Sequence, residues 1–374
     1  MDYEIYQNNH AKYIHITQHS IKAKQIIRDI IQDYSISTYR DHLLDLIHLI
    51  LKHQRTCSVS ECQAEHGLSD LILSESNKDR PMSCSLVICF IDLLKSSSPP
   101  PNATLNQLFA VTRELWWHEK VYMCRKSMEL SYRMIPYIEN DEPIITNVIR
   151  YIEDVSHCFK QQDLDRFQSI EYTEFFYTPT INTMTFDRET IKRLIQIIMA
   201  LFLKHTTHFP PGLEALANTI SMIYHTYQAS IHPIELLFNM CCANDDDTTQ
   251  LLDTVLTVYQ QDMYCMTLLQ HIQVNPHSLF LFFLQQCGST HDILIDSLLN
   301  DSDFLAYFYR YVVYAHQDIH QFYAALVVLD MVNPFRWILR DTVRVLQGDG
   351  FPYNTKPLIR RLCMLQEQLL SLLS

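Results

Sequence analysis

Glycine is scarce in this chain, which has only five among its 374 residues. Phosphate-binding loops, tight hairpins and nucleophile elbows need positive φ, which glycine tolerates best. Gly348 and Gly350 stand close together, but the third glycine of a dinucleotide-binding fingerprint is missing and a helix is expected before them. The sequence therefore disfavours nucleotide-binding folds.

Basic residues are also few, with 29 Lys and Arg against 42 Asp and Glu, a formal net charge of -13. This charge disfavours nucleic acid as a general partner, although a local basic ridge is compatible with it. The N-terminal segment lacks the patterns of secretory and mitochondrial targeting signals, and no apolar run is long enough to cross a bilayer. We therefore expect an intracellular protein with no membrane association.

Helical patterns fill most of the chain. Hydrophobic residues make up 48% of it and recur at steps of three and four. Prolines stand where helices are expected to start, at positions 143, 211, 233, 276, 334 and 357. Many helices joined by short loops predict an all-α protein, an irregular armadillo/HEAT-like helical solenoid, although no fixed repeat period is visible.

Changes in composition divide the chain into five parts. In order they are an N-terminal helical region (1–95), a Ser/Pro linker (96–102), central helices (103–168), an extended connection (169–186) and a C-terminal helical repeat region (187–374). The central part contains one long helix or two stacked ones over 104–134, ending before Pro136. Asp187 is expected to cap the first helix of the last part.

An acidic run at Asp245, Asp246 and Asp247 is similar to the magnesium motifs of all-α terpenoid synthases. Leu252 stands where the distal acid is needed, and the chain has no second acidic motif of that kind. An acidic first turn that favours a helix dipole explains the run more simply. A metal-dependent enzyme that uses these three residues remains the alternative function.

Two further groups have spacings found in metal sites. His15 and His19 lie one helical turn apart without an evident third ligand, and Cys57, Cys62 and His66 lack a fourth. A solvated helix face and a polar loop are the favoured interpretations. We expect no metal and no cofactor.

Aromatic residues are grouped in two places, at Trp116 and Trp117 and along a helix. That helix carries Phe304, Tyr307, Phe308, Tyr311 and Tyr314. Such groups can stack on bases or line a peptide groove. Core packing is the favoured interpretation, because the interior of a helical array requires aromatics at helical spacing.

The stretch from Asn333 to Leu362 is the strongest candidate for binding. Asn333 is expected to cap a helix that has Pro334 in its first turn. This helix is expected to end at Gly348. Basic and aromatic residues gather along the stretch: Arg336, Arg340 and Arg344 at i, i+4 and i+8, Phe351 and Tyr353 in a proline-bounded connection, and Arg360 and Arg361 in the last helix. These arginines form either a solvated face or a contact surface for an acidic partner segment.

Several segments together resemble the C-terminal part of the Lines protein family, over about residues 245–362. They are DDD at 245–247, NPHSLFLFFL at 275–284, HDILIDSLL at 291–299, NDSDFLAYFYRYV at 300–312 and DGFPYNTKPLIRRL at 349–362. The last segment is the most specific. The resemblance implies a non-enzymatic helical regulator of nucleus and cytoplasm, whose animal relatives act in segment polarity and Wnt-pathway output through protein partners. No catalytic residue is implied. We therefore predict a scaffold that binds proteins through Arg336 to Arg361.

Overall fold

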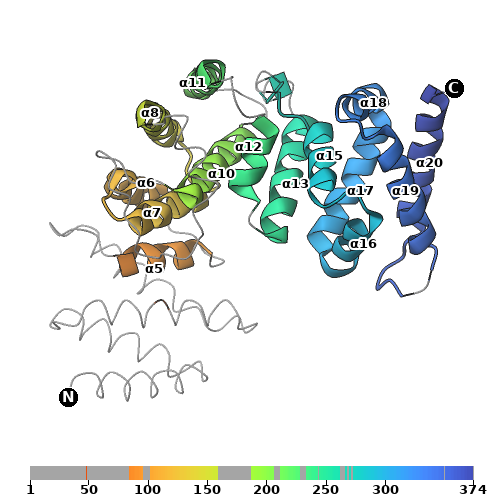
Figure 1. Cartoon of the computed structure of the whole chain (residues 1–374). Helices are drawn as coiled ribbons and strands as arrows, with labels where there is room; N and C mark the ends of the chain where they lie inside the picture. Colours follow the sequence, from red (N-terminus) through yellow and green to blue (C-terminus); the bar gives the residue numbers. More distant parts are fainter. Residues whose placement is uncertain are drawn as a thin grey trace, which may run out of the picture. The chain divides into compact units, whose positions relative to one another are not determined.

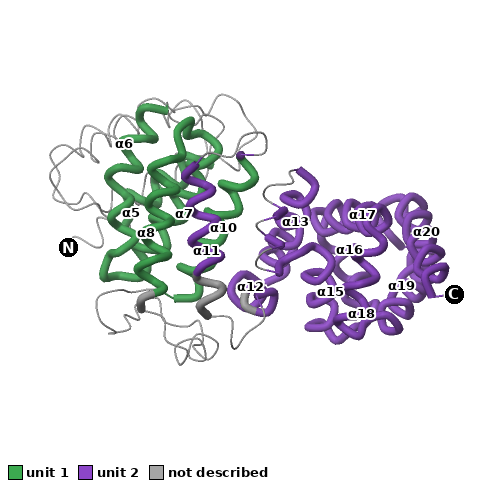
Figure 2. The backbone as a smooth tube through the Cα atoms, turned by 90° about the horizontal axis from the view of Figure 1, so that it is seen from above, with its two compact units in different colours: residues 1–204 green, residues 205–374 purple. Residues whose placement is uncertain are grey.

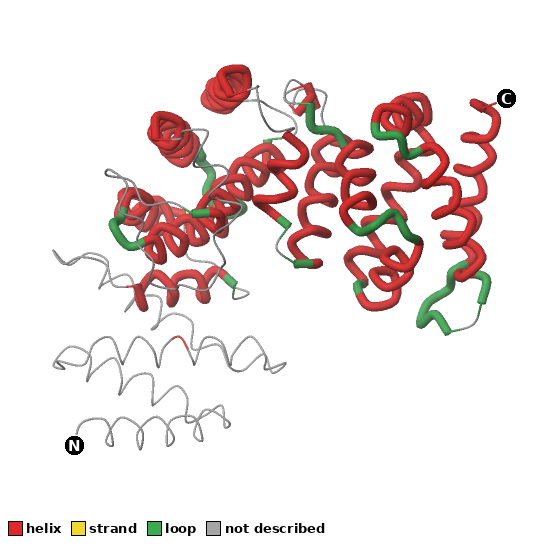
Figure 3. The backbone as a smooth tube through the Cα atoms, viewed as in Figure 1, coloured by secondary structure: helices red, strands yellow, loops and turns green. Residues whose placement is uncertain are grey.

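The computed structural model describes residues 48, 84–95, 102–158, 187–205, 211–227, 233–242, 244–261, 266–267, 269–270, 273–348 and 350–373. Within these residues the regular structure consists of fourteen α-helices and one 3-10 helix, with no strand (Figures 1 and 3). The predicted all-α class is confirmed. The candidate ligands between His15 and His66, most of the Ser/Pro linker and the extended connection lie outside the described residues.

The chain forms two compact units, Met1–Lys204 and His205–Ser374 (Figure 2). The described helices of unit 1 are α5 (Cys84–Leu94), α6 (Asn102–Thr112), α7 (Val121–Met134), α8 (Glu142–Cys158) and α10 (Arg188–Lys204), with a 3-10 helix at Arg113–Trp117. The α7 helix packs against α5, α10 and the 3-10 helix. Among the described helices of unit 1 it is the central one.

Two predictions about unit 1 are confirmed. The stretch 104–134 is two helices and not one, and α7 ends before Pro136 as expected. Asp187 caps α10, because its Oδ1 accepts hydrogen bonds from Thr190 N at 3.0 Å and from Thr190 Oγ1 at 2.7 Å.

The described helices of unit 2 follow one another with short connections. They are α11 (Pro211–Tyr227), α12 (Pro233–Cys241), α13 (Asp245–Gln261), α15 (Pro276–Gln286), α16 (His291–Asn300), α17 (Ser302–Gln317), α18 (Ile319–Val328), α19 (Val332–Leu346) and α20 (Lys356–Leu373). Three of them begin at a predicted proline. No single described helix is long and apolar enough to cross a membrane, and α18 with α19 passes that test only as a pair bent by 118°.

Three successive helices of unit 2 pack against the three helices that follow them. The α15 helix packs against α18, α16 against α19, and α17 against α20, so each helix contacts the third one after it. The α15 and α18 helices begin at Pro276 and Ile319, 43 residues apart, and α16 and α19 begin at His291 and Val332, 41 residues apart. The starts of α17 and α20, Ser302 and Lys356, are 54 residues apart. The helices α18 to α20 therefore lie over α15 to α17 in the same order.

The ends of α15 and α18 also share one type of backbone hydrogen bond. Ser289 N donates to Leu284 O at 2.8 Å, and Met331 N donates to Leu326 O at 2.8 Å. In each case the preceding residue has positive φ, 81° at Gly288 and 52° at Asp330. These are Schellman motifs, which satisfy carbonyl groups at a helix end. Val274 N donates to Leu269 O at 2.9 Å in a third such turn, with Gln273 at φ 58°.

Aromatic side chains form much of the core of unit 2. Phe280 of α15 contacts Phe308 and Tyr311 of α17, and Phe322 of α18 contacts Phe335 of α19. All five side chains are fully buried. The core interpretation of the 304–314 aromatics is confirmed for Phe304, Tyr307, Phe308 and Tyr311.

The tryptophan pair of unit 1 is divided between core and surface. Trp116 is fully buried, whereas Trp117 is half-buried and its Nε1 donates to Asp154 Oδ2 at 2.9 Å. The Arg150 guanidinium covers the Trp117 ring at 4.3 Å from its centre. Trp117 is therefore covered by its own neighbours.

One predicted helix boundary is wrong. Asn333 does not cap α19, because Phe335 N donates to Met331 O at 2.8 Å and the helix already begins at Val332. Met331 also closes the Schellman motif of α18. The turn between the two helices is therefore too short to leave Asn333 outside the helix.

Candidate partner-binding surface

The α19 helix has one buried face and one exposed stripe. Its buried residues are Phe335, Ile338, Leu339, Thr342, Val343 and Leu346. The exposed side carries Trp337, Arg340 and Arg344, with the half-buried Asp341 between them. These four residues follow the three and four residue steps of one helix face. We call them the α19 stripe.

Contacts within the α19 stripe hold Arg340 in place. Its guanidinium lies 4.2 Å from the centre of the Trp337 ring. Its Nε and Nη2 donate to the two carboxylate oxygens of Asp341 at 3.1 and 3.2 Å. Arg344 Nη2 lies 3.7 Å from Asp341 Oδ1. The stripe therefore presents two cations and one carboxylate next to an exposed ring.

Trp337 is the residue that the sequence analysis missed. Its side chain is 58% exposed, which is unusual for so large an apolar group. Its position three residues before Arg340 is the signal that could have identified it, because residues at i and i+3 are neighbours on a helix. Arg336, which the sequence analysis predicted for the binding surface, is half-buried and lies beside this stripe. It makes no ion pair among the described residues.

The other predicted residues lie in the connection after α19 and in α20. Phe351 and Tyr353 contact each other edge to face, with ring centres 5.7 Å apart. Both are half-buried, and burial raises the pKa of Tyr353. The Tyr353 hydroxyl is buried without a hydrogen-bond partner in the described part of the chain. The two rings therefore form a small cluster of their own.

Arg360 and Arg361 lie in the first turns of α20, the former exposed and the latter half-buried. Among the described residues, neither of them makes an ion pair. The structure thus gathers Arg340 and Arg344 around Asp341 and gathers Phe351 with Tyr353. It shows no direct contact that joins these groups into one site.

The acidic run at the start of α13 has the geometry of a helix cap. Asn244 Oδ1 accepts a hydrogen bond from Asp247 N at 2.8 Å, and Asp245 and Asp246 are exposed. Behind them, α13 buries apolar side chains, including Leu251 and Leu252. In the described ranges, no three His, Cys, Asp or Glu side chains are grouped so that they could hold a metal ion. The run therefore matches the capping interpretation.

A buried polar group in unit 2 was also missed by the sequence analysis. His277 of α15 is 2% exposed, and its ring is stacked on Tyr314, with centres 5.1 Å apart. Its Nδ1 lies 3.4 Å from the Tyr311 hydroxyl, and its Nε2 lies 3.4 Å from Asp318 Oδ2. Burial lowers the pKa of His277 to about 4, and the nearby Asp318 only partly opposes this. The imidazole is therefore neutral at pH 7.

The described helices and their buried and exposed faces define an all-α protein. Residues 203–325 match the family model of the Lines N-terminus domain. The expected resemblance to the Lines family is thus confirmed. Neither a curated protein nor a solved structure matches the chain.

The matched segment differs in extent from the resemblance described above. It begins at residue 203 instead of 245, it ends at residue 325 instead of 362, and the model describes the N-terminus and not the C-terminal part of the family. About a third of the chain is covered. It includes α11 to α17 and most of α18, whereas α19, α20 and the α19 stripe lie beyond it.

Proposed function

We propose that this protein is a non-enzymatic regulatory scaffold that binds protein partners through a surface of unit 2. The match to the Lines family model supports this proposal, because the resemblance to that family implies a regulator of signalling and transcription. The surface comprises Arg336, the α19 stripe, Phe351, Tyr353, Arg360 and Arg361. Its partner is a protein segment rich in acidic residues.

We further propose that α12 to α20 form an armadillo-like helical solenoid. Each of the helices from α15 to α17 packs against the third helix after it, which is the arrangement expected of stacked three-helix repeats. The helix starts are 43 residues apart for α15 and α18 and 41 for α16 and α19, within the roughly 40–47 residues of armadillo and HEAT repeats, whereas those of α17 and α20 are 54 apart. The common Schellman ends of α15 and α18 support the same interpretation.

The observation that carries the binding proposal is the exposed Trp337 beside Arg340. Tryptophan and arginine are enriched in the residues that dominate binding energy at protein interfaces. Arg340 is held by both the ring and Asp341, so less conformational entropy is lost when it binds a carboxylate. Two arginines against one aspartate leave the stripe positive in a chain of net charge -13. An acidic segment is the complementary partner.

The test is a charge reversal in the full-length protein. Arg336, Arg340 and Arg344 are changed together to Glu, and affinity capture from the native cells is compared with that of the unchanged protein. The matched control reverses three cations of unit 1, Arg113, Lys120 and Arg150, which changes the net charge equally.

We expect the α19 variant to lose an acidic partner that the control retains, with unchanged helix content by circular dichroism. If both variants keep every partner, the site assignment is wrong. If both lose the same partners, net charge and not this surface governs binding, and the assignment is equally wrong.

A further inference from the structure

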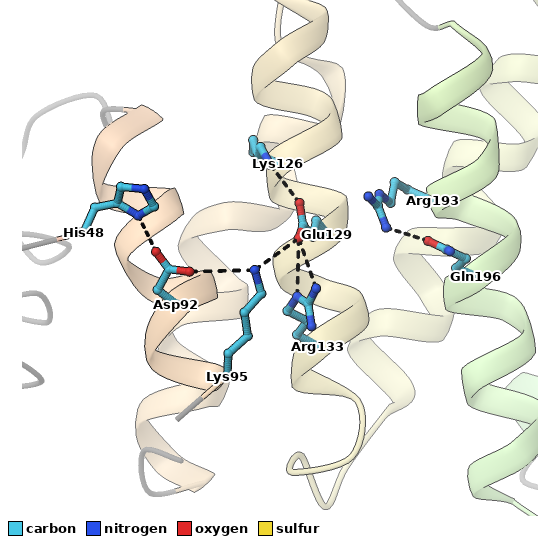
Figure 4. Close-up of polar contacts among 8 residues, drawn as sticks. All are labelled: His48, Asp92, Lys95, Lys126, Glu129, Arg133, Arg193 and Gln196. Carbon is cyan, nitrogen blue, oxygen red and sulfur yellow. Dashed lines mark hydrogen bonds and ion pairs between the residues drawn. The ribbon is translucent and has the colours of Figure 1, made fainter. Parts of the chain in front are cut away.

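Charged side chains from α7, from α10 and from the turn after α5 gather around the carboxylate of Glu129 in unit 1 (Figure 4). Glu129 Oε2 lies 2.9 Å from Lys126 Nζ, and Oε1 lies 3.3 Å from Arg133 Nη2. Lys95 Nζ, in the turn that follows α5, lies 3.9 Å from the same Oε1. The Glu129 side chain is only 8% exposed, so this carboxylate is the buried centre of a mainly cationic cluster.

Arg193 of α10 adds another cation to this cluster. Figure 4 shows its guanidinium facing Glu129 from the neighbouring helix. Burial by itself raises the pKa of Glu129, but Lys126, Arg193 and Arg133 together lower it to about 2. Arg193 Nη1 donates to Gln196 Oε1 at 2.8 Å, and no carboxylate is paired with Arg193 in the described part of the chain.

The cations of the cluster outnumber its carboxylates. Glu129 is the only carboxylate paired with Lys126 or Arg133 among the described residues, and it is also the one that Arg193 faces. Asp92 does not supply the missing charge, because it pairs with His48 and Lys95 (Figure 4). Lys126, Arg133 and Arg193 therefore share one negative charge, which leaves two positive charges in surplus.

The surplus of positive charge is accessible to an anion from solvent. The Lys126 and Arg133 side chains are 28% and 31% exposed, so they are partly desolvated but reachable. Charges in such a setting interact more strongly than they do in water. Glu129 also holds Lys126 and Arg133 in position, which reduces the cost of ordering them around a ligand.

We propose that Lys126, Arg133 and Arg193 form a binding site for a dianionic phosphate group. Two surplus positive charges match the charge of one phosphate monoester. The planar guanidinium groups can each donate two hydrogen bonds to phosphate oxygens, and the lysine adds a compact point charge. The site lies in unit 1, outside the Lines domain and the α19 stripe, so it does not rest on the function proposed above.

The test is isothermal titration calorimetry of the full-length protein at low ionic strength. Inorganic phosphate is the first probe, and a phosphoserine peptide is the second, with its unphosphorylated form as the blank. Similar affinity for both probes identifies a site for free phosphate groups, and tighter binding of the peptide identifies a phosphorylated protein segment as the source. Either result supports the proposal.

Three variants make the test specific. Arg193→Gln and, separately, Lys126→Gln should weaken phosphate binding about tenfold, the effect of losing a charge-assisted hydrogen bond. Arg113→Gln is the matched control, because it removes the same charge from an exposed arginine of unit 1 that pairs with Glu114. We expect its affinity to be unchanged.

A fourth variant, Glu129→Gln, changes the surplus in the other direction. It raises the surplus to three charges and leaves an amide oxygen that can still accept hydrogen bonds from Lys126 and Arg133, so phosphate should raise the melting temperature of this variant more than that of the unchanged protein. If neither probe binds at millimolar concentration, or if Arg113→Gln weakens binding as much as Arg193→Gln does, the cluster is only an internal network of ion pairs and the proposal is wrong.

Discussion

His277 Nε2 lies 3.4 Å from Asp318 Oδ2, which connects the first turn of α15 to the turn between α17 and α18. The imidazole is also surrounded by the rings of Tyr311, Tyr314 and Phe322. Burial among these rings disfavours the charged imidazolium more than the single carboxylate favours it, since the pKa falls. The stability of unit 2 should therefore depend on pH.

The first prediction follows from this pKa. The unfolded chain protonates His277 near pH 6.5 and the folded chain only near pH 4, so the unfolded state binds more protons between these values. The contribution of neutral His277 to the free energy of unfolding is therefore complete above about pH 6.5 and decreases as the pH falls toward 4. The loss at the lower limit is up to about 3 kcal/mol, since one pKa unit corresponds to roughly 1.4 kcal/mol.

Urea denaturation between pH 4 and 7.5, followed by circular dichroism, measures this effect. His277→Gln stays neutral and should reduce the pH dependence relative to the unchanged protein. His320→Gln, at an exposed position of α18, is the control and should leave the dependence as it is. Equal pH profiles for the unchanged protein and His277→Gln would contradict the prediction.

The second prediction concerns the left-handed residue at the end of α18. Asp330 has φ 52°, a conformation that glycine adopts without the steric cost that other residues carry. Asp330→Gly should therefore raise the free energy of unfolding by about 0.5–1 kcal/mol, after the greater chain entropy of glycine in the unfolded state is subtracted. Ala324→Gly, at an exposed site within α18, should lower it by about 1 kcal/mol. A lower urea midpoint for Asp330→Gly would refute the prediction.

The sequence predicted where most helices begin but not the Schellman motifs at which some of them end. Prolines and apolar spacing located most helix starts, because these signals are local. The positive φ values at Gln273 and Asp330 could not be predicted, since neither position carries the glycine that normally indicates such a turn. The tight turn at Asp330 and Met331 then placed Asn333 inside α19. The offset between α15 and α18 is likewise a tertiary feature without a visible sequence repeat.

The same distinction applies to the candidate site. Arginine spacing predicted that Arg340 and Arg344 share a helix face, because helical periodicity alone determines it. The exposure of Trp337 depends on which neighbours cover α19, and the burial of His277 depends on contacts with α17 and α18. These are long-range contacts that local spacing does not encode. The roles of Trp337 and His277 therefore could not be read from the sequence.

The third prediction separates capping from metal binding at the start of α13. Asn244→Ala should lower the free energy of unfolding by about 1 kcal/mol, because it removes the acceptor for Asp247 N. Asp246→Asn changes an exposed carboxylate near the positive end of the helix dipole and should cost no more than about 0.5 kcal/mol. Urea denaturation with and without millimolar Mg²⁺ measures both. Stabilisation by Mg²⁺ that Asp246→Asn abolishes would favour the metal-dependent alternative.

The fourth prediction tests whether the α19 stripe is kept for binding or for stability. Trp337 and Arg340 lie on the surface of α19, so their contact contributes little to folding. Trp337→Ala and Arg340→Ala should each change the free energy of unfolding by less than about 1 kcal/mol. Leu339→Ala, on the buried face of the same helix, should lower it by about 2–5 kcal/mol. Urea denaturation of the three variants gives these values directly.

Partner capture with the same variants completes this comparison. If Trp337→Ala keeps its stability and loses the acidic partner, the exposed ring contributes to binding and not to folding, as the proposed surface requires. If Trp337→Ala is instead as unstable as Leu339→Ala, the ring is part of the packing of α19. Its exposure would then carry no argument for a partner, and the binding surface would have to be sought among Phe351, Tyr353 and Arg360.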